Sequence, residues 1–226
     1  TYFNNKYIKR DINKAIKYFT LAANQNYSDA QNTLGYIYSN GTFVPRDINR
    51  AIYYYSLSAK QNNKMAQFNL AHIYYEGKYV PVDIDKALYY GKLSSEQNFI
   101  KAHILLGSIY EEGIYIKQNI NKAIYYYKLA ADQNNCYAQL LLGNIYEQGK
   151  YVPKDIDKAI HYYSLSCQHN NSESQLLLGL IFYEGKYGEK YIYKGIDLII
   201  QSSKNNCKFG QFSLAYIYQT GKYIKR

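Results

Sequence analysis

The histidines and cysteines are the residues of this chain whose chemistry suits catalysis or metal binding. They are His72, His103, His161, His169, Cys136, Cys167 and Cys207. No two histidines stand four residues apart, and no two cysteines have the Cys-x-x-Cys spacing of a zinc site. The chain also contains no Ser-His-Asp order, P-loop or dinucleotide-binding glycine pattern. The sequence therefore predicts a protein that is not an enzyme and that holds no cofactor and no metal.

The three cysteines leave two interpretations open. Cys136 begins one predicted helix and Cys167 ends the next, so antiparallel packing would bring the two thiols close enough for a disulfide. An odd number of cysteines at unrelated positions instead favours free thiols in a reducing compartment. The second interpretation favours the cytoplasm, although the sequence does not identify the compartment.

Tyrosine accounts for 31 of the 226 residues, and much of it recurs every 36 residues. The three aromatic columns are Tyr38, Tyr74, Tyr110, Tyr146, Phe182 and Tyr218; Tyr18, Tyr54, Tyr90, Tyr126 and Tyr162; and Phe43, Tyr79, Tyr115, Tyr151, Tyr187 and Tyr223. Such columns could stack nucleobases or sugar rings. Their fixed recurrence favours packing between repeats, with the hydroxyl groups at the edge.

The formal net charge of +10 also resolves into columns. One contains Lys14, Arg50, Lys86, Lys122, Lys158 and Lys194, and the other contains Lys6, Lys78, Lys150, Lys186 and Lys222. Two basic stripes along one edge could follow nucleic acid or another polyanion, and binding would then fall steeply with salt. The other interpretation is a solvated edge whose lysines pair with neighbouring carboxylates. We retain polyanion binding as the alternative function.

These columns depend on an exact internal repeat. Glycine recurs at Gly41, Gly77, Gly113, Gly149, Gly185 and Gly221. Leucine, isoleucine and asparagine columns that begin at Leu34, Ile37 and Asn26 keep the same 36-residue step over six copies. Self-similarity at this period is typical of repeat architectures.

Each unit reads as two helices, an A helix before the recurring glycine and a B helix after it. Apolar residues fall at helical spacing in both segments. The glycine suits the left-handed end of the A helix, and Asp47, Asp83 and Asp155 stand where they can cap the B helix. A column of small residues in mid-helix A, which includes Gly35, Ala71 and Gly143, predicts close approach of the B helix.

The run Leu-Gly-x-Ile-Tyr-x-x-Gly followed by Asp-x-x-Lys-Ala, in a 36-residue unit, resembles the Sel1-like repeat family, relatives of the tetratricopeptide repeat. The resemblance covers essentially the whole chain. It implies an all-α, right-handed α/α solenoid of about 12 helices. It also implies an adaptor or scaffold that holds a partner protein or peptide in a concave groove lined by the A helices.

Two features depart from the family pattern. Asparagine occupies the column where the family has glycine, and both residues tolerate a positive φ. The last complete copy has Tyr191 in place of the capping aspartate and Gly195 in place of alanine. The pattern therefore predicts the B helix of that copy least well.

The repeat also sets the expected domain organisation. We expect one repeat domain over 1–226, with a truncated repeat at 1–27, complete repeats at 28–63, 64–99, 100–135, 136–171 and 172–207, and a partial repeat at 208–226. The incomplete repeats at both ends suggest a fragment of a longer protein, and we expect a monomer. No stretch approaches the roughly 18 apolar residues of a membrane-spanning helix.

The predicted partner-binding surface is the side of helix A that varies between copies. Its candidate residues are Phe68, His72, Tyr75, Glu111, Asn144, Glu147, Tyr183 and Tyr216. Phe68 belongs to a column that is apolar from the second copy onward and includes Leu140 and Leu176. That column could contact a partner, or it could pack between neighbouring A helices. The aromatic residues in the other columns are the candidate anchors.

Overall fold

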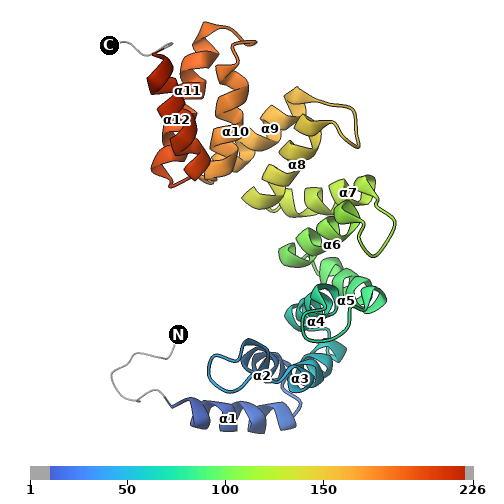
Figure 1. The fold of residues 1–226 in the computed structure, drawn as a ribbon. Coiled ribbons are helices and arrows are strands. Elements are labelled where there is room, and N and C mark those ends of the chain that lie inside the picture. The colour runs from blue at the N-terminus through green and yellow to red at the C-terminus, as the bar shows by residue number, and fades with distance from the viewer. Residues whose placement is uncertain (1–10, 222–226) are drawn as a thin grey trace. The chain divides into compact units, whose positions relative to one another are not determined.

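The computed structural model describes residues 11–221, which form twelve α-helices and no strand (Figure 1). In chain order they are α1 (Ile12–Asn24), α2 (Ser28–Asn40), α3 (Ile48–Lys60), α4 (Lys64–Glu76), α5 (Ile84–Glu96), α6 (Ile100–Glu112), α7 (Ile120–Ala131), α8 (Cys136–Gln148), α9 (Ile156–Cys167), α10 (Ser172–Tyr183), α11 (Glu189–Lys204) and α12 (Lys208–Thr220). Even-numbered helices are the A helices. The predicted all-α repeat fold is confirmed. Lys6, Lys222 and Tyr223 lie outside the described residues.

The chain divides into two compact units, residues 1–106 and 107–226, with the boundary inside α6. The described part of the first unit contains α1 to α5 and the start of α6. The second contains the rest of α6 and α7 to α12. Within each unit, consecutive helices pack against each other, as α2 does on α3 and α8 on α9. Each repeat therefore has a helix-turn-helix form.

Polar caps define where the B helices begin. The carboxylates of Asp47, Asp83 and Asp155 each accept a hydrogen bond from the backbone N–H three residues later, at 2.9–3.0 Å. Asn119 caps α7 in the same way. These bonds satisfy donors that the first turn of a helix leaves free. These four B helices therefore start at the same point of their repeats, whereas α11 starts three residues earlier.

Left-handed residues end the helices and reverse the chain. Gly149 follows α8 with a φ of +64° and donates its N–H to the carbonyl of Ile145 at 3.3 Å. The asparagine column after the B helices also has positive φ in every copy, from 55° to 66°. Asparagine tolerates this conformation better than most residues. Both turns of the repeat therefore have a residue suited to the backbone they need.

A tight contact within several repeats joins a mid-helix glycine of helix A to a tyrosine of helix B. A Cβ on Gly143 would lie 2.4 Å from the ring of Tyr163, and one on Gly107 would lie 2.3 Å from Tyr127. In repeat 64–99 the glycine is on helix B and the larger residue is on helix A, because Ala71 packs near Gly91. The predicted close approach of helix B is confirmed, and side-chain volume on one helix compensates for volume on the other.

The B helix that the pattern predicted least well is well formed. Helix α11 spans 16 residues, although Gly188 at its N-cap makes no side-chain capping bond. Ile192, Ile196 and Ile199 are buried on one face and contact Ile217 of α12 through a shared apolar cluster. Burial of this face stabilises the helix without the capping aspartate, because tertiary packing supplies most helix stability in proteins.

The glycine–tyrosine contact predicts a substitution effect that depends on its partner. Gly143→Ala should destabilise the second unit by about 1–3 kcal/mol, because the new methyl group overlaps a ring that is 0% exposed. In a Tyr163→Ala background the same change should stabilise, by up to about 1 kcal/mol, since alanine is the better helix former. Urea unfolding of the four proteins measures both effects. An equal effect in both backgrounds would contradict the contact.

Candidate partner-binding surface

The column that contains Phe68 packs between repeats. Leu140 and Leu176 are 2% and 6% exposed. Phe68 is half-buried, and its ring centroid lies 5.5 Å from that of Phe99 and 5.8 Å from that of His72. Phe212, in the last copy, is 74% exposed. The packing interpretation therefore holds for the middle copies of this column. Phe68 mainly packs against neighbouring rings and contributes little exposed surface.

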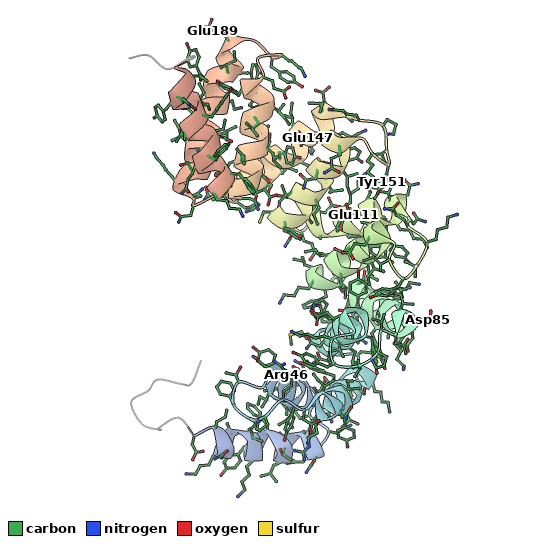
Figure 2. All side chains as sticks on the ribbon, viewed as in Figure 1. Arg46, Asp85, Glu111, Glu147, Tyr151 and Glu189 are labelled. Atoms are coloured by element: carbon green, nitrogen blue, oxygen red, sulfur yellow. The ribbon has the colours of Figure 1, made fainter. Side chains whose placement is uncertain are left out.

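Two of the predicted surface residues are held by a buried tyrosine beneath them. The hydroxyl of Tyr127 donates to Glu111 Oε2 at 2.6 Å, and that of Tyr163 donates to Glu147 Oε2 at the same distance. Both carboxylates are on A helices of the second unit (Figure 2). Asn144 Oδ1 lies 2.7 Å from the hydroxyl of Tyr163. The helix pair thus fixes the direction of these side chains.

The sequence analysis did not single out this tyrosine column. Tyr55, Tyr127 and Tyr163 occupy one repeat position, and Phe19, Gly91 and Ile199 occupy it in the other copies. The 36-residue spacing was the signal that could have found it. The structure shows rings at 2%, 0% and 0% exposure whose hydroxyl groups reach the A-helix face.

Burial keeps these hydroxyl groups protonated. It raises the pKa of Tyr55 to about 12. Burial, and then the hydrogen bond to a carboxylate, also raise the pKa of Tyr127 and Tyr163. A tyrosinate beside a carboxylate would place two like charges in contact. Tyr127 and Tyr163 therefore stay protonated above the pH at which an exposed tyrosine ionises, and each continues to donate to its surface glutamate.

The aromatic residues that are exposed on the A helices do not belong to the column of the buried Tyr55, Tyr127 and Tyr163. Tyr36 is 54% exposed and Tyr216 is 59% exposed, whereas Tyr75 and Tyr183 are half-buried. Another column of the same helices is also exposed, and the sequence analysis named none of its members. It includes Met65, Tyr137 and Phe209, at 44%, 50% and 62%. These residues present apolar surface to solvent on several A helices.

The first unit contains a recess of about 220 Å³ on the A-helix side. It is lined by Tyr36, Ser39, Ile48, Tyr55, Asn69, His72, Ile73, Glu76, Lys78 and Tyr79. His72 Nδ1 lies 3.5 Å from Glu76 Oε2 within the same helix. Of the predicted surface residues, His72 alone lines this recess, because Phe68 and Tyr75 lie elsewhere on α4. Its volume is below the 300–1,000 Å³ of a typical small-molecule site.

The basic column at the start of the B helices makes local contacts. Lys86 Nζ lies 2.7 Å from Asp83 and 4.9 Å from the ring centroid of Tyr74. Lys158 makes the same pair of contacts with Asp155 and Tyr146. The aromatic columns also stack within repeats, as Tyr110 does on Tyr126 with ring centroids 5.9 Å apart. Ion pairing and aromatic packing therefore account for these columns.

The cysteines and histidines form no reactive or metal-binding cluster in residues 11–221. All three cysteines are free, so the disulfide interpretation for Cys136 and Cys167 is wrong for this structure. Burial raises the pKa of Cys167 to about 11, which lowers its thiolate fraction at neutral pH. Within the described residues, no three His, Cys, Asp or Glu side chains gather as metal ligands, and no helix is long and apolar enough to span a membrane.

The repeats match a known sequence family along the whole chain. The model of the Sel1 repeat matches residues 2–27, 28–63, 64–99, 100–135, 136–171, 172–206 and 209–226. No curated protein sequence matches the chain significantly.

Solved structures with the same fold include two longer bacterial proteins. A protective antigen of uropathogenic Escherichia coli that displays an SLR fold is 29% identical, with a TM-score of 0.89 over 98% of this chain and 48% of the antigen. A Sel1 repeat protein from Oxalobacter formigenes is 27% identical, with a TM-score of 0.80 over 93% of this chain and 61% of that protein. The chain spans about half to three fifths of the length of these relatives.

The buried tyrosines predict a loss of stability at alkaline pH. The pKa of Tyr55 rises from about 10 in the unfolded chain to about 12 in the folded one. Its contribution is complete below pH 10 and falls as the pH rises to 12, because the unfolded state loses its proton first. Tyr55→Phe should therefore flatten the fall in urea midpoint of the first unit between pH 9 and 11.5. The exposed Tyr53→Phe is the control, and equal slopes in both variants would contradict the assignment.

Proposed function

Because the chain belongs to the Sel1 repeat family, we propose that it is a non-catalytic scaffold that binds a partner protein or peptide on the exposed face of its A helices. Sel1 repeat proteins generally mediate protein–protein interactions. The proposal places binding on the A-helix faces within each unit, which the sequence analysis expected to line a concave groove.

One observation carries the proposal: the A helices are constant inside and variable outside. Leu34, Leu70, Leu106 and Leu142 occupy one fixed column, and all are 0% exposed. On the opposite side, the column of Tyr36 changes to His72, Leu180 and Tyr216 and is exposed or half-exposed. A scaffold needs identical residues where repeats stack and different residues where it meets a partner. Exposed apolar groups on such a face are typical of interaction sites.

The B helices provide a natural comparison. Tyr53, Tyr89 and Tyr125 are 58–60% exposed, and Lys17, His161 and Asp197 occupy this position in the other copies. Each ring also packs edge-on against the tyrosine that follows it, at 5.1–5.2 Å between centroids. These three tyrosines are thus exposed but already have an aromatic neighbour within their own helix. They therefore offer matched aromatic controls for the A-helix face.

The alternative function, binding of a polyanion along the basic edge, gains no support from the geometry. Lys86 and Lys158 are already paired with capping aspartates and lie over tyrosine rings. Paired surface charges still attract polyanions, but more weakly and with a smaller salt dependence than free ones. This alternative remains a prediction that the next experiment also addresses.

Display selection of random peptides on the intact chain tests the scaffold proposal. Enriched peptides should lose at least about tenfold in affinity to the A-helix variants Met65→Ser/Tyr36→Ser or Tyr137→Ser/Tyr216→Ser, because interface aromatics dominate binding energy. The B-helix control Tyr53→Ser/Tyr125→Ser should bind within twofold of the unsubstituted chain. Fluorescence anisotropy measures affinity, and thermal melting verifies that every variant folds.

Two outcomes would contradict the scaffold proposal. If the B-helix control alone lost binding, the interaction surface would be on the opposite face. If enriched peptides were acidic, bound with a steep salt dependence and were lost on Lys86→Gln/Lys122→Gln/Lys158→Gln, the basic-edge alternative would replace it.

A further inference from the structure

The recess in the first unit exists because one repeat has a small residue where its neighbours have large ones. Ser39 occupies the position of Tyr75, Glu111, Glu147 and Tyr183 in the other repeats. In the second unit, the glutamates at this position extend to the buried tyrosine hydroxyl at 2.6 Å. Ser39 reaches the hydroxyl of Tyr55 at 3.1 Å with a shorter side chain. The volume that a glutamate would fill is left open beside it.

The lining of the recess combines apolar and aromatic groups with one carboxylate, one imidazole and the ammonium group of Lys78. Ile48, Ile73 and the ring of Tyr55 supply hydrophobic surface. Tyr36 and Tyr79 add two rings that are 54% and 44% exposed. Glu76 adds a carboxylate. A ligand that suits this lining has an apolar stem and a cationic end, because aromatic faces and carboxylates both attract cations.

Glu76 is poorly compensated inside the molecule. It is the last residue of α4, and no basic residue occupies the last turn of that helix. A carboxylate at a helix C-terminus is opposed by the negative end of the helix dipole. Within residues 11–221 its one ion-pair partner is His72, at 3.5 Å. A cation in the recess would relieve this uncompensated charge.

Two cations of the protein border the recess, and both are held on Tyr79. The guanidinium of Arg46 (Figure 2) lies 4.6 Å from the ring centroid of Tyr79 and donates to its hydroxyl. Arg46 also donates to the carbonyls of Ser39 and Asn40, at 2.9 and 3.1 Å. Lys78 Nζ lies 5.3 Å from the same ring. They show that rings here accept cations, while Tyr36 and Glu76 remain available for an incoming one.

We propose that this recess binds the side chain of an arginine in the partner of the scaffold, with the guanidinium at Glu76 and the stem against Ile48, Ile73 and Tyr55. Arginine fits better than lysine because its planar group stacks on a tyrosine face and pairs with a carboxylate at once. The volume of about 220 Å³ is suited to one side chain. This subsite rests on the proposed scaffold function and names the partner chemistry for the first unit.

The direct test uses a small probe on the intact chain. Titration of acetyl-arginine methylamide, followed by ¹H–¹⁵N NMR, should shift the amide signals of Tyr36, Asn69 and His72 in a saturable way. Acetyl-citrulline methylamide, which has the same shape without the charge, should bind at least about threefold more weakly, as expected for the loss of one partly exposed ion pair.

Two substitutions separate charge from volume. Glu76→Gln should weaken the arginine probe about twofold to fivefold and leave citrulline unchanged. Ser39→Gln should fill the recess, accept the bond from Tyr55 as Glu111 does from Tyr127, and abolish the binding of both probes while the melting temperature is maintained. Equal affinity for citrulline, or unchanged binding to the Ser39→Gln variant, would overturn the subsite.

The two proposals can fail separately. Should the arginine probe not bind while the Tyr137→Ser/Tyr216→Ser variant still loses enriched peptides, the subsite would be wrong and the scaffold function would stand. Loss of enriched peptides on the Ser39→Gln variant, with a required arginine in their sequences, would support both. Failure of the probe and of every A-helix variant would overturn both.

Discussion

The packing of a B-helix ring into a gap on the A helix of the same repeat is the contact on which the structure depends. Gly107 and Gly143 leave room for Tyr127 and Tyr163, and neither ring has exposed surface. Helix A loses helix propensity at each glycine, about 1 kcal/mol relative to alanine. Burial of a full aromatic ring offsets this loss. Three repeats share this ring-to-glycine fit, and repeats 64–99 and 172–207 fill the same space with Ala71 against Gly91 and Gly179 against Ile199.

The same tyrosines join the core to the surface. A ring buried against glycine positions its hydroxyl at the A-helix face, where it holds Glu111 and Glu147 at 2.6 Å. A change in the residue above the hydroxyl then alters the surface without altering the core. Ser39 is the case in which that residue is short, and a recess is the result. Variation at the A-helix face can thus arise on an unchanged core.

Sequence periodicity predicted the features that local chemistry determines. The glycine after each A helix and Asp83 before a B helix have conformational or capping roles that residue type alone reveals. The Tyr55 column was missed because Phe19, Gly91 and Ile199 interrupt it. The larger Ala71 on helix A accompanies the smaller Gly91 on helix B, and this relation is visible only when the two helices are packed together. Helix α11 was under-predicted because buried isoleucines replaced a cap. The recess could not be predicted from the sequence, since it depends on the space that the short side chain of Ser39 leaves between packed helices.

The net charge of this molecule does not show which contacts its individual charged residues make. The net charge of +10 comes in part from lysines such as Lys86 that are paired with a cap and stacked on a ring, and these serve the repeat itself. Acidic side chains are fewer, yet Glu76, Glu111 and Glu147 stand in the last turns of A helices, where the helix dipole opposes them. The hydroxyl groups of Tyr127 and Tyr163 offset this cost for Glu111 and Glu147, because they donate to the two carboxylates at 2.6 Å. For Glu76, whose ion-pair partner in the described residues is His72, a basic group of a partner at the A-helix face would supply the compensation.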